Sequence, residues 1–114
     1  MLEIKTRKQE KICILELSGT LDLDGALALK DAIQTERQNG FMKIVLNFSG
    51  VTAVMSAYLA TLTSPIRALV SIKGVVALCN LSDSVHKVLK RAMFYPIVKI
   101  FKTEEEAVEA LSSS

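Results

Sequence analysis

One short run near the middle of the chain limits the fold most strongly. Residues 42–48 read MKIVLNF, and Ile44, Val45 and Leu46 follow one another without a polar residue between them. A strand with one face in water alternates apolar and polar residues, whereas a strand covered on both faces does not. The run therefore predicts a central strand, of the kind that usually belongs to a parallel or mixed sheet.

Four further segments have the composition of strands. Residues 2–5 alternate apolar and charged side chains, and residues 12–17 (ICILEL) are rich in β-branched ones. These two segments predict a hairpin around the polar turn RKQEK. The hairpin is expected to end at Gly19, where an irregular connection, GTLDLDG, leads into the first helix. Residues 75–79 (VVALC) and 97–101 (IVKIF) predict two shorter strands.

Helical spacing and capping residues separate these strands. Asp24 is a suitable N-cap for a helix over residues 25–38, and residues 82–93 read as a second capped helix. Thr103 and Glu106 form a capping box for a short helix near the C-terminus. The alternation predicts an α/β sandwich: a single domain over residues 1–114, whose mixed sheet has about four to five strands and carries about four α-helices.

The segment after the central strand has a helical stripe with an interruption. Its apolar residues recur at helical spacing from Met55 to Val70. Pro65 lies within this stripe, where it removes a backbone donor and clashes with the preceding turn. The helix is therefore expected to kink there, or to restart with Ser64 as a local cap.

Charge and cysteine content exclude several classes of protein. Fourteen Lys and Arg against twelve Asp and Glu give a net charge of +2, too small an excess to indicate nucleic-acid or membrane binding. Cys13 and Cys79 lie far apart in β-branched runs, which predicts two buried, reduced thiols in a cytoplasmic protein. These cysteines and His86 are too few for a tetrahedral metal site built from Cys and His alone. No uninterrupted apolar run has the length of a membrane span, and no cofactor is expected.

Motifs of common enzyme sites are absent from the sequence. It contains no phosphate loop and no dinucleotide-binding glycine pattern, and VMSAY around Ser56 is not a nucleophile elbow. A hydrolase site of Ser56, His86 and Asp22 has no support from their spacing. The sequence therefore does not predict an enzyme.

Three segments together resemble the STAS domain family, which includes bacterial anti-sigma factor antagonists and a module of sulphate transporters. The most specific segment is KIVLNFSGVTAVMSAYLATL (43–62), similar to the family pattern I-V-L-D-L-S-G-V-x-x-I-D-S-S-G-L-x-x-L. Residues 17–33 resemble the L-x-G-x-L-D segment and the helix after it, and residues 74–111 resemble the closing strand, helix, strand and helix. The resemblance thus covers nearly the whole chain.

This resemblance implies partner switching in bacterial transcription and stress responses. In the family, the dephosphorylated antagonist binds an anti-sigma factor that is also a serine kinase, which frees the sigma factor without direct contact to nucleic acid. The kinase ends the interaction by phosphorylating a serine at the start of the second helix, and a phosphatase would reverse this step. Ser56 matches that serine, and Asp22 matches an Asp that helps to shape the partner surface.

The chain departs from the family pattern on both sides of Ser56. Met55 replaces the usual Asp, and Ala57 and Tyr58 replace Ser and Gly. The first change removes an acceptor that orients the hydroxyl, and Tyr58 adds bulk where glycine lets a partner backbone approach. Together with Asp22 and Ser56, these three are the candidate partner-binding residues.

Other interpretations stay open from the sequence. Ser56 is also a good N-cap, and Met55 with Tyr58 would suit a scaffold that binds its partner constitutively. A STAS subunit of a transport complex, docking on an ATPase, would have the same fold. His86 with Lys87, Lys90 and Arg91 marks either a solvated helix face or a basic docking surface for an acidic partner.

Overall fold

A five-stranded mixed sheet forms the centre of the molecule. The computed structural model describes residues 1–92 and 94–113. β1 and β2 form an antiparallel hairpin, and β2 to β5 run parallel to one another in chain order. The strands are β1 (Leu2–Gln9), β2 (Ile12–Leu21), β3 (Lys43–Val54), β4 (Val75–Cys79) and β5 (Lys99–Phe101).

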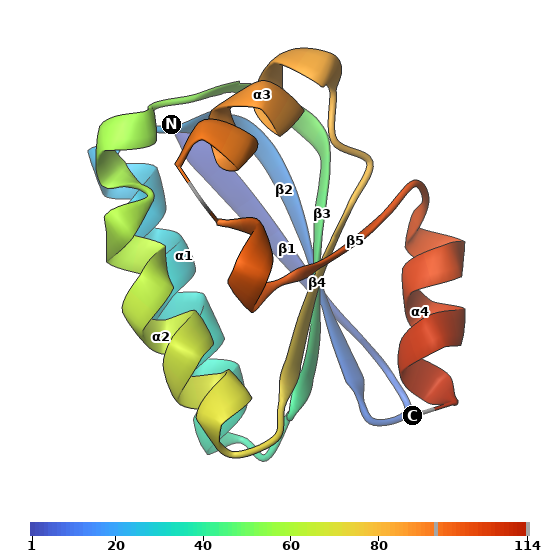
Figure 1. Cartoon of the computed structure of the whole chain (residues 1–114). Coiled ribbons are helices and arrows are strands. Elements are labelled where there is room, and N and C mark those ends of the chain that lie inside the picture. Colours follow the sequence, from blue (N-terminus) through green and yellow to red (C-terminus); the bar gives the residue numbers. More distant parts are fainter. Residues whose placement is uncertain (93, 114) are drawn as a thin grey trace.

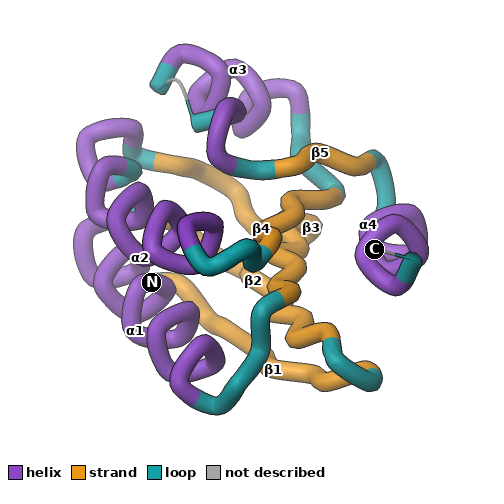
Figure 2. Tube along the Cα trace, turned by 60° about the horizontal axis from the view of Figure 1, so that its bottom comes forward, coloured by secondary structure: helices purple, strands orange, loops and turns teal. Residues whose placement is uncertain are grey.

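Helices lie on both faces of this sheet. α1 and α2 lie side by side on one face and α4 lies on the other, while α3 sits at the end of the sheet (Figures 1 and 2). The described residues thus confirm the predicted α/β sandwich with a mixed sheet and four α-helices. The helices are α1 (Leu23–Gln38), α2 (Ala60–Ser71), α3 (Asp83–Arg91) and α4 (Glu104–Ser112), with short 3-10 helices η1 (Ser56–Tyr58) and η2 (Tyr95–Ile97).

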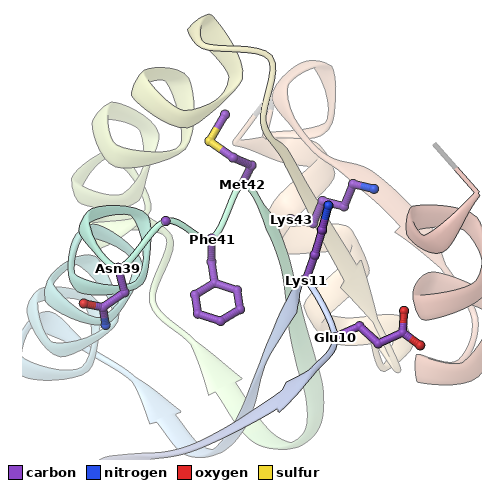
Figure 3. Close-up of a pocket in the computed structure, with 7 residues that line it drawn as sticks. Glu10, Lys11, Asn39, Phe41, Met42 and Lys43 are labelled. Atoms are coloured by element: carbon purple, nitrogen blue, oxygen red, sulfur yellow. The ribbon is translucent and has the colours of Figure 1, made fainter.

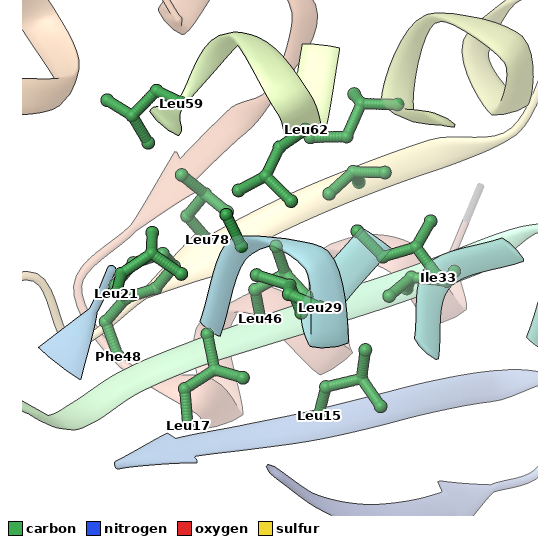
Figure 4. Close-up of a cluster of buried hydrophobic side chains, with 14 of the residues drawn as sticks. Leu15, Leu17, Leu21, Leu29, Ile33, Leu46, Phe48, Leu59, Leu62 and Leu78 are labelled. Carbon is green, nitrogen blue, oxygen red and sulfur yellow. The ribbon is translucent and has the colours of Figure 1, made fainter. Parts of the chain in front are cut away.

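Alternate residues of the central strands enter two separate hydrophobic cores. On β3, Leu46 belongs to the larger core against α1 and α2, and Val45 belongs to the smaller core against α4. Leu46, Leu29 of α1 and Leu62 of α2 belong to this larger core (Figure 4). Because both faces of β3 are covered, neither set of alternate positions needs to be polar, which explains the unbroken apolar run.

A polar network joins the smaller core to the start of α4. Asn47 of β3 is only 5% exposed, and its Nδ2 donates to Glu104 Oε1 at 3.0 Å. Its Oδ1 accepts from the Ser49 N–H at 2.9 Å and from Asn80 Nδ2 at 3.1 Å. Glu104 Oε1 also accepts from Arg7 Nη2 of β1 at 2.6 Å. The Asn47 amide therefore links β3 to the end of β4 and to the start of α4, and through Glu104 also to β1.

The prediction of two buried, reduced thiols is confirmed. Cys13 lies in the larger core and Cys79 in the smaller one, and neither forms a disulfide. Burial raises the pKa of Cys13 to about 11 and that of Cys79 to about 12. Since the thiolate is the reactive form, both cysteines are inert core residues at neutral pH.

The hairpin strands are longer than the sequence predicts. β1 continues to Gln9, so the chain reverses only over Glu10 and Lys11, with Glu10 at a φ of +56°. β2 continues past Gly19 to Leu21, with register shifts against β3 near Gly19. The predicted turn and irregular connection are wrong here, because the solvent-exposed side of an edge hairpin accommodates charged residues and because small shifts in register absorb the irregularity.

The prediction that Pro65 makes the helix restart is wrong. α2 is continuous from Ala60 to Ser71, and Ser64 caps nothing. Pro65 is the sixth residue of α2, so it removes only the bond to the carbonyl of Thr61, near the helix start, while its own ring is buried.

The later caps are confirmed, but the last strand is shorter than predicted. Ser82 Oγ accepts from the Val85 N–H at 3.3 Å, and Thr103 Oγ1 accepts from the Glu106 N–H at 3.1 Å. Residues 97 and 98 precede β5 instead of belonging to it. Met93, the predicted end of the third helix, lies outside the described residues.

Candidate functional site

The candidate residues gather where the parallel strands β2 and β3 end. Leu21 and Val54 are register partners, and the Met55 N–H donates to the Leu21 carbonyl at 3.0 Å. Asp22 and Met55 directly follow these partners on strands that lie about 4.8 Å apart. The structure thus brings together the two segments that the sequence indicates separately.

Asp22 fixes the start of α1. Its Oδ1 accepts from the Gly25 N–H at 2.8 Å, and its Oδ2 lies 3.9 Å from the N-terminal ammonium of Met1. The prediction that Asp24 is the N-cap is wrong, because the helix already begins at Leu23 and Asp24 is an exposed residue of its first turn. Asp22 therefore has a structural role in addition to its place on the surface.

Removal of this cap tests the structural role of Asp22. Asp22→Ala is expected to lower the free energy of unfolding by about 1 kcal/mol, because the Gly25 N–H loses its acceptor. Asp22→Asn keeps a capping oxygen and should change stability by only a few tenths of a kcal/mol, and Asp24→Ala is the matched control on the same helix. Urea denaturation of the four proteins measures the differences. An Asp22→Ala protein as stable as the Asp24→Ala control would contradict this role.

Ser56 is exposed and does not act as a helix cap. The N-cap position of η1 is Met55, and no side chain caps this short helix. Backbone bonds hold the turn, from the Tyr58 N–H to the Met55 carbonyl at 3.1 Å and from the Leu59 N–H to the Ser56 carbonyl at 3.2 Å. Within residues 1–92 and 94–113 the Ser56 hydroxyl has no hydrogen-bond partner. The N-cap interpretation of Ser56 is therefore wrong, and its hydroxyl is open to a modifying enzyme or a partner.

Exposed apolar side chains lie beside this hydroxyl. Met55 is 47% exposed and Ala57 is exposed, while Tyr58 is half-buried against the larger core. Leu23, next to Asp22, and Leu27, one turn further along α1, are each 46% exposed. Exposed apolar side chains on two segments that follow paired strand ends are typical of a binding surface. We call Asp22, Leu23, Leu27, Met55 and Ser56 the Ser56 surface.

Sequence reasoning missed Leu23 and Leu27. The buried side of α1 includes Ala26, Leu29 and Ile33, which follow helical spacing. Leu23 and Leu27 are four residues apart and share a different side of the helix. This position outside the buried side could have indicated that both leucines are exposed.

A hollow of about 450 Å³ lies at the opposite end of the parallel strands (Figure 3). Lys11 of the hairpin turn and Phe41 and Met42 of the loop before β3 line it. The Lys8 ammonium lies 5.0 Å from the centre of the Phe41 ring and 3.3 Å from Glu36 Oε1. This hollow is therefore separate from the Ser56 surface.

Two further kinds of site are not found in the described residues. No group of three or more His, Cys, Asp or Glu there could hold a metal ion. None of the helices over residues 1–92 and 94–113 has the length and apolar character needed to cross a bilayer.

Comparisons with known proteins agree on one family. The model of the STAS domain matches residues 3–107. A homolog of TM1081 from Thermotoga neapolitana, provisionally named an anti-sigma factor antagonist, is 31% identical over 101 residues, which cover 88% of this chain and 89% of the relative.

Solved structures share the fold. TM1081 from Thermotoga maritima, also provisionally named an anti-sigma factor antagonist, superposes with a TM-score of 0.84 at 27% identity, covering 94% of this chain and 92% of that one. The anti-sigma factor antagonist SpoIIAA of Bacillus, in its unphosphorylated form, gives a TM-score of 0.82 at 22% identity, covering 98% of each chain. At that identity the likeness to SpoIIAA shows the fold alone.

Proposed function

Because the chain belongs to the STAS domain family, we propose that it is an anti-sigma factor antagonist whose binding to an anti-sigma factor is ended by phosphorylation of Ser56. One observation carries the proposal: Ser56 is exposed, its hydroxyl has no partner within the described residues, and the apolar residues on both sides of it, Met55 and Ala57, are exposed as well. The 31% identical relative, with its provisional name as an antagonist, supports the choice of partner.

The surroundings of Ser56 explain how a phosphate would act. A phosphoserine carries about −1.5 to −2 charges at neutral pH. A partner that covers Met55 and Leu23 would have to remove water from this charge next to the Asp22 carboxylate. Desolvation and like-charge repulsion therefore both oppose the complex, while the fold, which does not use the hydroxyl, is unchanged.

The proposed role is that of a binding protein in the cytoplasm. Its partner is an anti-sigma factor with serine kinase activity, and a phosphatase restores the unmodified antagonist. Through this exchange of partners the protein regulates transcription without itself contacting nucleic acid.

Mass spectrometry of the native protein tests this proposal. We expect a phosphate on Ser56 whose occupancy differs between growth and stress, and capture of an anti-sigma factor by the unphosphorylated form. Ser56→Ala should lose the modification and still capture the partner. If Ser56 stays unmodified in every condition while the partner is still captured, phosphorylation is not the switch.

A constitutive scaffold is the second candidate, and the exposure of Met55 favours it. An apolar side chain in place of a carboxylate beside Ser56 extends the apolar contact that a permanent partner would cover. The two candidates differ in one result, because a scaffold keeps its partner when Ser56 is replaced by Asp.

A further inference from the structure

Positive charge is concentrated on α3 and β5. Residues 81–103 contain five Lys and Arg and one acidic residue, a net charge of +4 in a chain whose total is +2. The rest of the chain is therefore slightly acidic. The five cations are Lys87, Lys90, Arg91, Lys99 and Lys102, which we call the α3–β5 cations.

The α3–β5 cations are exposed and unneutralised. The ion pairs in the described part of the chain use Arg7, Lys8 and the N-terminal ammonium, and none of them uses an α3–β5 cation. The helix dipole accounts for Lys90 and Arg91, which lie in the last turn of α3. It does not account for the others. The acidic residues nearest in sequence are Asp83 in the first turn of α3 and three glutamates in the first turn of α4, of which Glu104 pairs with Arg7. A solvated helix face usually mixes both signs, so this excess indicates an anionic partner.

A hollow with apolar and polar walls lies between α3 and β5, next to one of these cations. It has a volume of about 380 Å³ between the start of α3 and β5. Its apolar lining is Leu81, Ile100 and Phe101, and its polar lining is Asp83, His86 and Lys102. β5 is also an edge strand, paired only with β4. The surface therefore offers a site for an apolar side chain beside the Lys102 ammonium, and the other α3–β5 cations lie on the same two elements.

We propose that α3 and β5 bind an acidic polypeptide segment that carries an apolar side chain. Its carboxylates lie against the α3–β5 cations, and its apolar side chain fills the hollow between Leu81 and Phe101. This recognition combines long-range attraction, which speeds association, with one buried anchor, which fixes the register.

Two other anionic partners fit this surface less well. A membrane surface would require apolar side chains to insert, and the exposed large apolar residues of the described chain lie elsewhere, at Met1, on α1, at Met55 and at the end of α2. A nucleic acid backbone would contact the cations but leave the apolar hollow unfilled. The polypeptide uses both features.

Peptide binding in solution tests the inference. The probe is a short, fluorescently labelled peptide of alternating Glu and Ser around a central Phe, titrated at low salt. We expect saturable binding that weakens with added salt, and weaker binding when the central Phe of the peptide is replaced by Ala. Replacing Lys87, Lys90 and Arg91 by Gln should weaken binding by about tenfold, the sum of three exposed ion pairs.

A matched variant controls for total charge. Lys5, Arg67 and Lys73 are exposed, have no ion pair in the described chain and lie on other elements, so replacing these three by Gln removes the same charge elsewhere. Equal weakening in both triple variants would overturn the inference. So would tighter binding of an oligonucleotide of equal charge, or of phosphatidylglycerol vesicles. Because the assay contains no anti-sigma factor, its result is independent of the proposed role of Ser56.

Discussion

Ser56→Asp is expected to weaken binding of the anti-sigma factor by about a hundredfold, which corresponds to roughly 3 kcal/mol. The new carboxylate would lie beside Asp22 and within the apolar contact made by Met55 and Leu23. Its desolvation cost arises only in the complex, where the removal of water also strengthens its repulsion by Asp22. Titration calorimetry with the purified anti-sigma factor measures the loss, and phosphorylated protein should lose at least as much.

Two variants separate this effect from the loss of the hydroxyl and from the added charge alone. Ser56→Ala should keep the affinity of the native protein, because the hydroxyl bonds nothing within the described residues. Ser112→Asp adds the same charge on α4, which lies on the opposite face of the sheet, and should also bind normally (Figure 1). Denaturation of Ser56→Asp should show unchanged stability. Native affinity in Ser56→Asp would contradict the switch and support the constitutive scaffold.

Asn47→Asp is expected to lower the free energy of unfolding by about 3 kcal/mol at neutral pH. The Asn47 amide donates to Glu104 from a position that is 5% exposed, and a carboxylate there has no proton to donate. It would instead place a second negative charge at hydrogen-bond distance from Glu104. A loss of this size is a large fraction of the stability of a small domain, and urea denaturation measures it directly.

Acid should reduce this defect. In the variant, burial next to Glu104 raises the pKa of the new carboxyl in the folded protein above its value in the unfolded chain. Stability relative to the native protein is therefore lost as pH rises and regained as pH falls toward 4, when a shared proton again bridges the two side chains. A defect independent of pH would indicate that packing, and not charge, is responsible.

A double variant tests whether Glu104 is the cause. Glu104→Gln alone should cost about 1 kcal/mol, because it weakens the bond from Arg7. Combined with Asn47→Asp, it supplies an amide that donates to the new carboxylate, so the double variant should be more stable than the two single effects predict. Since the family pattern has Asp at this place, such a rescue would show that the cost depends on the partner residue in this chain.

Strands and helix starts that depend on neighbouring residues could be predicted from the sequence. The apolar run around Val45 predicted a strand covered on both faces, and Ser82 and Thr103 marked helix starts correctly, because a cap depends on residues only a few positions away. The choice between Asp22 and Asp24 was different. It depended on where β2 ends against β3, which is a contact between distant segments.

The candidate site could be predicted only in part from the sequence. The family resemblance indicated Ser56, and the parallel register of β2 and β3 then explains why Asp22 belongs beside it. Leu23 and Leu27 could not be assigned to that surface, because a leucine on a helix predicts burial until its neighbours are known. The effect of Pro65 was overestimated for a related reason, since its cost depends on which carbonyl it leaves unpaired.

The way in which Met55 and Ser56 are held has a consequence for how such proteins diversify. Main-chain bonds from Met55 to Leu21 and from Tyr58 to Met55 fix this turn, so its shape does not depend on which side chains it carries. Duplicated copies of the gene can therefore change residues 55–57 with little risk to folding. Each copy can then acquire its own partner through a few exposed positions, while the fold stays the same.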